Sequence, residues 1–95
     1  MKRYTVKIPP EVETEIRHLH PALKSKIHKA LDEIEGEPFL GKPLRGVLKG
    51  LWSYRVSHYR IVYEIRRDKV LVEVIDIAER KIIYEQVARA ISALR

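Results

Sequence analysis

The chain has no cysteine, and this absence excludes disulfides, a thiolate nucleophile and a cysteine-type zinc site. Its longest apolar runs are a few residues, too short to cross a membrane, and no charged-then-apolar leader opens it. No Walker-type glycine loop, paired-carboxylate site or Ser-His-Asp set is recognisable in the sequence. We therefore expect a cytoplasmic protein that uses neither a metal nor a cofactor.

Acidic residues are also missing from one long segment. The chain has a net charge of +6, and residues 38–63 contain five basic side chains but no Asp or Glu. The basic residues of this segment are Lys42, Arg45, Lys49, Arg55 and Arg60, and His58 lies among them. A solvated surface normally mixes both signs of charge, whereas a block of one sign indicates an anionic partner.

The 95 residues, 45% of them hydrophobic, are enough for one small domain, which we expect to span residues 1–95. Residues 3–8 alternate as a strand does, and Pro9-Pro10 end that strand and begin a helix. Pro21 then divides the helical region into a hairpin that closes at Gly36. The remaining pattern predicts three strands and a last helix, at residues 51–56, 59–66, 69–77 and about 85–94.

Short connections determine how the three later strands pair. Residues 36–49 form a Gly- and Pro-punctuated connection, too polar for a strand except around 44–48. Breaks of two residues, Ser57-His58 and Arg67-Asp68, allow only antiparallel hairpins. The predicted fold is therefore α+β, in the order β-α-α-β-β-β-α, with an antiparallel sheet packed against a helical hairpin and a C-terminal helix.

A two-residue turn at Ser57-His58 places Arg55 opposite Arg60 on one sheet face, which also carries Ser53. Two opposed arginines without an acid between them cost a few tenths of a kcal/mol. Arginine offers permanent charge and planar paired donors, so the pair can clamp a phosphate. The alternative is an exposed surface pair that is merely tolerated. The lack of acids in the segment favours the clamp.

Three short motifs follow one another in the second half of the chain: Leu44-Arg45-Gly46, then Tyr59-Arg60-Ile61-Val62-Tyr63, then Arg80-x-x-x-Tyr84. In this order, and with the preceding β-α-α elements, the chain resembles the RelE/ParE toxin superfamily over nearly its full length. The resemblance implies a type II toxin of the RelE kind, a metal-independent endoribonuclease that cleaves mRNA in the ribosomal A site. The implied partners are a RelB-like antitoxin, in a hetero-oligomer, and the ribosome with its mRNA.

The resemblance also assigns roles by position. It implies a catalytic role for four residues, Arg55, Arg60, Arg80 and Tyr84. Arg60 and Arg80 suit the stabilisation of charge on the transition state, and Tyr84 suits proton relay or stacking on a base. RNA or ribosome binding is expected of the other basic side chains of the acid-free segment, which are Lys42, Arg45, Lys49 and His58.

One position departs from the family's pattern, because Ser53 stands where a lysine is expected. Arginine is a poor proton acceptor, with a pKa above about 12, so the identity of the general base stays open. His58 is one candidate for the base, but it is alternatively an exposed turn residue without a role in catalysis. Tyr84 is alternatively a core aromatic residue at the junction of sheet and helix. The other histidines (His18, His20 and His28) are expected at the surface. The other aromatic residues of the strands (Trp52, Tyr54, Tyr59 and Tyr63) are expected in the core.

Two other functions remain open from the sequence. A ParE-type poison of DNA gyrase would share the fold, and a non-enzymatic or decayed basic module would bind nucleic acid without cutting it. The Arg80 and Tyr84 pair, together with Arg55, favours the ribonuclease, because gyrase poisoning requires no such cluster.

Overall fold

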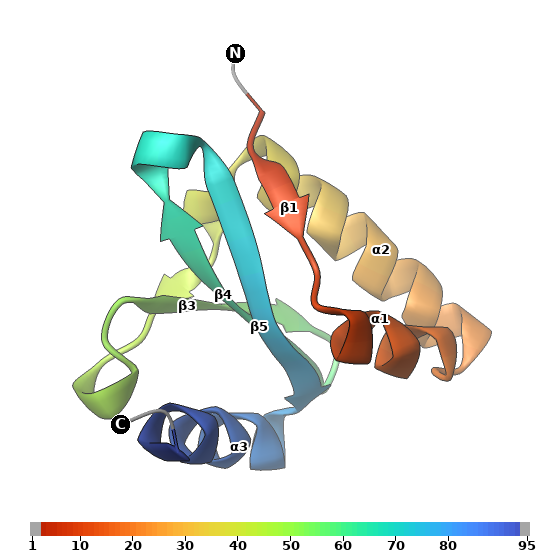
Figure 1. Ribbon diagram of the computed structural model, residues 1–95. Coiled ribbons are helices and arrows are strands. Elements are labelled where there is room, and N and C mark those ends of the chain that lie inside the picture. Colours follow the sequence, from red (N-terminus) through yellow and green to blue (C-terminus); the bar gives the residue numbers. More distant parts are fainter. Residues whose placement is uncertain (1–2, 94–95) are drawn as a thin grey trace.

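A five-stranded sheet forms the centre of the computed structural model, which describes residues 3–93 (Figure 1). The strands are β1 (Thr5–Lys7), β2 (Lys42–Pro43), β3 (Leu51–Val56), β4 (Tyr59–Arg66) and β5 (Leu71–Glu79). They lie in the spatial order β1-β5-β4-β3-β2. The pairs β2–β3, β3–β4 and β4–β5 are antiparallel, and β1 joins β5 in parallel. The α+β class and the order of the predicted elements are confirmed, although β2 is an additional strand and the parallel β1 makes the sheet mixed.

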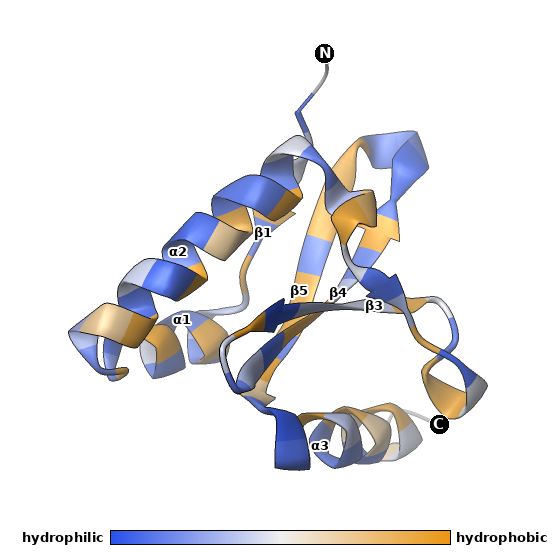
Figure 2. Ribbon diagram, turned by 180° about the vertical axis from the view of Figure 1, so that it is seen from behind, coloured by the Kyte–Doolittle hydropathy of each residue, from blue (hydrophilic) through white to orange (hydrophobic). Residues whose placement is uncertain are grey.

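Three helices cover the two faces of the sheet: α1 (Pro10–Arg17), α2 (Pro21–Gly36) and α3 (Arg80–Ala93). Both helices of the hairpin begin at a proline. Its fixed φ suits the first turn, and its lack of an N–H costs no hydrogen bond there, because an N–H at that position has no partner within the helix. The hairpin packs on one face and α3 on the other (Figure 1). Figure 2 shows that the outer side of α2 is hydrophilic, as an amphipathic helix requires. No helix within residues 3–93 is long and apolar enough to span a bilayer.

Consecutive strand residues supply two separate cores, because strand side chains alternate between the faces. Ile61 and Tyr63 are fully buried beneath the hairpin, where Ile27 of α2 meets them. Val62, between them in the sequence, is fully buried on the other face with Ile83 of α3. The sheet is therefore a shared middle layer, and both helical layers depend on it.

The turn between β4 and β5 is longer than predicted. The prediction of a two-residue turn at Arg67-Asp68 is wrong, because Arg66 pairs with Leu71 and the four residues between them form the turn. A single 3₁₀ turn at Arg67–Lys69 leads into Val70, whose φ of 50° is left-handed. A β-branched residue rarely adopts this conformation, so the residue types gave no signal for it.

The start of the last helix also differs from the prediction. Instead of an extended stretch that leads to a helix near residue 85, β5 continues to Glu79 and α3 begins at Arg80. The N–H of Arg80 donates to the carbonyl oxygen of His58 at 2.8 Å, which anchors this junction to the β3–β4 turn. Leu94, the predicted last residue of the helix, lies outside the described residues.

The connection before β3 contains a strand that the sequence did not predict. Lys42 and Pro43 form β2 by pairing with Ser53 and Trp52, and Gly46–Leu48 form a 3₁₀ turn. Residues 44–48, the least polar part of this connection, therefore contain a 3₁₀ turn and no strand. An exposed edge strand of two residues needs no alternating apolar pattern, which is why polarity alone missed it.

Gly41 lies against the most deeply buried aromatic side chain. The hydroxyl of Tyr63, which is fully buried, donates to the carbonyl oxygen of Pro38 at 2.6 Å. A Cβ atom on Gly41 would overlap this hydroxyl and would lie 2.9 Å from the carbonyl oxygen of Ser53. The close approach of the two backbone segments therefore requires glycine at this position.

We predict that Gly41→Ala destabilises the fold by about 1–3 kcal/mol, because Tyr63 must move and lose its buried hydrogen bond. Urea unfolding followed by circular dichroism measures this change. Gly36→Ala is the matched control, since the nearest atom to its Cβ would be 4.0 Å away. Equal stability of the two variants would contradict the packing described for Gly41.

Candidate functional site

The three arginines predicted to be catalytic lie at one end of the sheet. Arg55 is directly opposite Arg60, so the register predicted from the two-residue turn is confirmed. Arg60 also pairs with Ala78, two residues before Arg80 begins α3. Directly opposed residues share a sheet face, and Ala78 belongs to the core beneath α3. Arg55 and Arg60 are therefore on the α3 side, where the β3–β4 turn meets the start of that helix.

The arginine side chains carry charge that the protein does not neutralise. Arg60 is half-buried, and its Nη1 donates to the carbonyl oxygens of Tyr59 at 2.9 Å and Ser57 at 3.4 Å. Arg55 and Arg80 are exposed. Within residues 3–93, none of the three forms an ion pair with an acid. Each guanidinium has five N–H donors, so most of them are available to an anion such as a phosphate.

His58 lies beside Arg80 because the backbone of the β3–β4 turn is bonded to the start of α3. These two residues, with Glu79 and Lys81, line a surface cavity of about 440 Å³. The His58 ring is exposed and packs edge-on against Tyr59, with ring centroids 5.0 Å apart. The structure thus brings this predicted RNA-binding residue into the arginine cluster.

Tyr84 reaches the same sheet face from α3. Because α3 begins at Arg80, the two residues are one helical turn apart and share a side of the helix. The Tyr84 hydroxyl lies 2.9 Å from Oγ of Ser53, and either oxygen can be the donor. Ser53 is buried and lies two residues before Arg55 on β3. Tyr84 is thus partly buried at the sheet–helix junction, and its hydroxyl points toward the row of site residues.

The remaining predicted RNA-binding residues are the exposed Lys42, Arg45 and Lys49. Lys42 is directly opposite Ser53 and therefore shares its sheet face, beside Tyr84. Arg45 and Lys49 flank the 3₁₀ turn between β2 and β3, so they extend the positive surface away from the arginine cluster. No ion pair within the described part of the chain neutralises any of the three.

Sequence reasoning missed the part that Ser53 has in this site. It placed Ser53 on the sheet face of Arg55 and Arg60 and noted it as a departure from an expected lysine, but assigned it no role. A signal was nevertheless present, because strand alternation puts this serine on the same sheet face as Leu51 and Arg55, between an apolar residue and a charged one. A single hydroxyl in such a row requires a partner, which local patterns cannot name.

Other residues lie as the sequence indicated. Tyr63 is fully buried, and Trp52, Tyr54 and Tyr59 are half-buried against the same core. The three histidines of the helical hairpin, His18, His20 and His28, are exposed. Residues 3–93 contain no group of three or more His, Cys, Asp or Glu side chains that could hold a metal ion.

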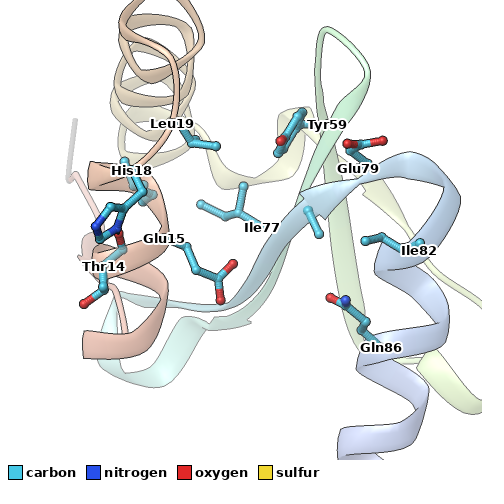
Figure 3. A pocket seen from close by; sticks show the side chains of 11 residues that line it. Thr14, Glu15, His18, Leu19, Tyr59, Ile77, Glu79, Ile82 and Gln86 are labelled. Atoms are coloured by element: carbon cyan, nitrogen blue, oxygen red, sulfur yellow. The ribbon is translucent and has the colours of Figure 1, made fainter.

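A second cavity, of about 450 Å³, lies between α1 and the β5–α3 junction and contains none of the predicted site residues (Figure 3). Glu15 lines it together with apolar side chains such as Ile77 and Ile82. Burial, and to a lesser degree the nearby Asp76 and Glu11 carboxylates, raises the pKa of Glu15. Burial is also the main cause that raises the pKa of Asp76, whose carboxylate accepts the Ile77 N–H at 2.8 Å. This region is acidic and is not suited to bind a phosphate.

We predict that Asp76→Asn raises the melting temperature at about pH 7. The pKa of Asp76 in the folded state lies above the ordinary value of 3.8. Ionisation of Asp76 therefore destabilises the folded state as the pH rises from 3.8 through the folded pKa. The amide oxygen still accepts the Ile77 N–H. Thermal unfolding at about pH 3 and about pH 7 tests this, and the gain should vanish at the lower pH.

Asp68→Asn, in the exposed β4–β5 turn, is the matched control for the loss of one negative charge. A lower melting temperature of Asp76→Asn at neutral pH would show that the carboxylate stabilises the fold, contrary to the direction given for its pKa.

Known proteins are similar to this chain in sequence and in fold. Residues 6–84 match the family described as ParE toxin of type II toxin–antitoxin system, parDE. Toxin RelG of Mycobacterium tuberculosis is 31% identical over 85 residues, which cover 87% of this chain and 98% of RelG. Toxin RelE of the same organism is 51% identical over 45 residues, 47% of this chain and 46% of that relative, so this match spans about half of its length.

A solved structure agrees with these sequence matches. The toxin–antitoxin complex RelBE2 of M. tuberculosis superposes with a TM-score of 0.74 at 29% identity, over 84% of this chain and 94% of the matched one. The fold and the motifs thus define a small toxin of the RelE/ParE superfamily, as the sequence resemblance indicated. Within that class, the chain belongs to the ParE toxin family of type II toxin–antitoxin systems.

Proposed function

We propose that this toxin is a ribosome-dependent endoribonuclease that cleaves mRNA in the ribosomal A site. The observation that carries the proposal is the cluster of Arg55, Arg60 and Arg80 at one end of the sheet, with no acid paired to them within residues 3–93. Such a surface suits a polyanion. The similarity to toxins named RelE and RelG supports the same reading. A target on translating ribosomes implies a cytoplasmic site of action.

The proposed reaction is attack of a ribose 2′-OH on its own 3′ phosphodiester. It needs removal of one proton, stabilisation of charge on the phosphorane-like transition state and protonation of the 5′ leaving oxygen. Arg60 and Arg80 suit the charge stabilisation, because each guanidinium can donate two parallel hydrogen bonds to phosphate oxygens. Arginine does not exchange its proton near neutral pH, so Tyr84 or His58 is the group through which a proton moves.

The functional test is incubation of the purified toxin with programmed ribosomes and with the same mRNA free in solution. We expect cleavage at codon boundaries on the ribosome and little on free RNA, because the ribosome orients the substrate. Comparable cutting of free RNA would contradict the proposed dependence on the ribosome.

A second candidate function is inhibition of DNA gyrase, because the matching family carries the name of the ParE toxin. The same purified protein, added to a gyrase supercoiling assay, distinguishes the two. Trapped DNA breaks with intact mRNA would favour the gyrase function and overturn the ribonuclease proposal.

We predict that Arg60→Ala and Arg80→Ala each lower the cleavage rate on ribosomes by at least about tenfold, the scale of one lost transition-state charge contact. Primer extension on the cleaved mRNA measures the rate. Arg89→Ala is a matched control, because it removes an exposed arginine of the same helix whose only partner in the described chain is Glu85. Cleavage by Arg89→Ala should equal that of the wild type.

His58→Ala tests the alternative proton acceptor in the same assay. If this variant alone abolishes cleavage while its circular dichroism spectrum is unchanged, His58 is the general base and Tyr84 is not.

We further propose a RelB-like antitoxin as the partner, forming a hetero-oligomer with the toxin, since the similar M. tuberculosis structure is a toxin–antitoxin complex. An acidic segment, disordered when free, would complement the positive surface and fold on binding. Amphipathic segments of this kind could lie on the sheet or along the helical hairpin, where apolar burial would dominate the affinity.

We predict that Lys42→Glu, Arg45→Glu and Lys49→Glu each weaken ribosome association more than antitoxin association. Exposed charges act strongly on binding to a polyanion and less on binding driven by apolar burial. Sedimentation with ribosomes and co-purification with the product of an adjacent acidic reading frame measure the two. Lys69→Glu, in the turn at the other end of β4, is the control. Loss of antitoxin binding alone would assign this surface to the antitoxin.

A further inference from the structure

Ser53 is the only buried polar or charged residue among residues 3–93, with 6% of its surface exposed. Its row on the sheet is apolar on two sides, with Leu51 before it on β3 and Val62 directly opposite on β4, both buried. Burial of a hydroxyl in such a place destabilises the fold unless the hydroxyl has a hydrogen-bond partner. An alanine or valine would fill the position without this requirement, so the hydroxyl calls for an explanation other than packing.

The partner of this hydroxyl is Tyr84, whose phenolic oxygen is 2.9 Å from Oγ of Ser53. The bond connects two elements that are distant in the chain, β3 and α3. Tyr84 also packs against the core that Ile83 and Val87 of α3 form with Leu51 and Val62 of the sheet. The helix packing holds the backbone of Tyr84, and the serine holds the far end of its side chain.

The bonded position coincides with the centre of the proposed site. Along β3, Ser53 precedes Arg55 by two residues on the same face, and Arg55 is opposite Arg60. On its other side, Ser53 is opposite Lys42 of β2. The phenolic oxygen is therefore held next to the positions of two cationic side chains, Lys42 and Arg55, with Arg80 one helical turn away on its own helix. We infer that Ser53 is a positioning residue, which holds the Tyr84 hydroxyl where the RNA phosphodiester binds.

The chemistry of serine suits this role, which rests on the ribonuclease function proposed above. A hydroxyl both donates and accepts, so Ser53 can bond to the Tyr84 oxygen whether Tyr84 keeps its proton or passes it to the RNA. A lysine ammonium could only donate, and its burial would cost far more. Serine thus leaves Tyr84 paired in both protonation states, while the charge needed at this point can come from Lys42 opposite.

Single-turnover cleavage of mRNA on programmed ribosomes, measured against toxin concentration, tests the inference. We expect Ser53→Ala to lower the maximal rate about tenfold, about 1.4 kcal/mol, and to change the half-saturating concentration less than about twofold. Ser53→Thr keeps Oγ and should restore the rate to within about threefold of the wild type. The double variant Ser53→Ala/Tyr84→Phe should be no slower than Tyr84→Phe, because the serine acts through the phenol.

A purely structural role predicts a different pattern. Val87→Ala weakens the packing of α3 and leaves the hydroxyl pair intact, so it should unfold at a lower temperature and still cleave at the wild-type rate. The ¹³C resonance of the Tyr84 Cζ atom, identified by its absence in Tyr84→Phe, should shift in Ser53→Ala and stay in Ser53→Thr and Val87→Ala.

Three outcomes overturn the inference. Ser53→Ala that cleaves as fast as an active wild type removes the positioning role and leaves the ribonuclease function standing. A double variant clearly slower than Tyr84→Phe shows that Ser53 acts by another route. A wild-type chain that leaves ribosome-bound mRNA intact overturns the ribonuclease function itself, and with it the catalytic purpose of the pair.

Discussion

The antiparallel ladder between β3 and β4 is the constraint on which both the cores and the site depend. Alternation along these strands sends Ile61 into the core beneath the hairpin and Val62 into the core beneath α3, and both are fully buried. The same alternation puts Arg55 and Arg60 together on the α3 side. A shift of the register by one residue would expose both cores and separate the arginines, so folding and function require the same pairing.

Stability and function make opposite demands at this end of the sheet. Opposed arginines repel each other, and the fold accepts that cost beside the well-packed Ala78 and Val56. Within residues 3–93 no acid is paired with these arginines, although Glu79 lines the same surface cavity as His58 and Arg80. Glu15 lines the other cavity, and burial raises the pKa of its carboxyl and that of Asp76. This separation of charges leaves one positive surface free to bind an anion.

Helix α3 connects the site to the fold, because one element carries both Arg80 and Tyr84 and buries Ile83 and Val87. Its first residue is bonded to the backbone of His58, and its Tyr84 hydroxyl is bonded to Ser53. The helix is therefore fixed at the β3–β4 turn and again over the middle of β3. Both contacts involve residues with proposed roles in cleavage, so the bonds that fix the helix also place groups of the site.

The sequence alone determined the features that arise from local patterns. Prolines marked the starts of both hairpin helices, and alternation with a two-residue turn determined that Arg55 faces Arg60. Only the tertiary structure decided the parallel addition of β1, the edge strand β2, the early start of α3 and the pairing of Ser53 with Tyr84. Each of these four features either joins segments that are distant along the chain or has no signal in the residue types. Periodicity reports which side of an element is buried, and it does not report which other element covers that side.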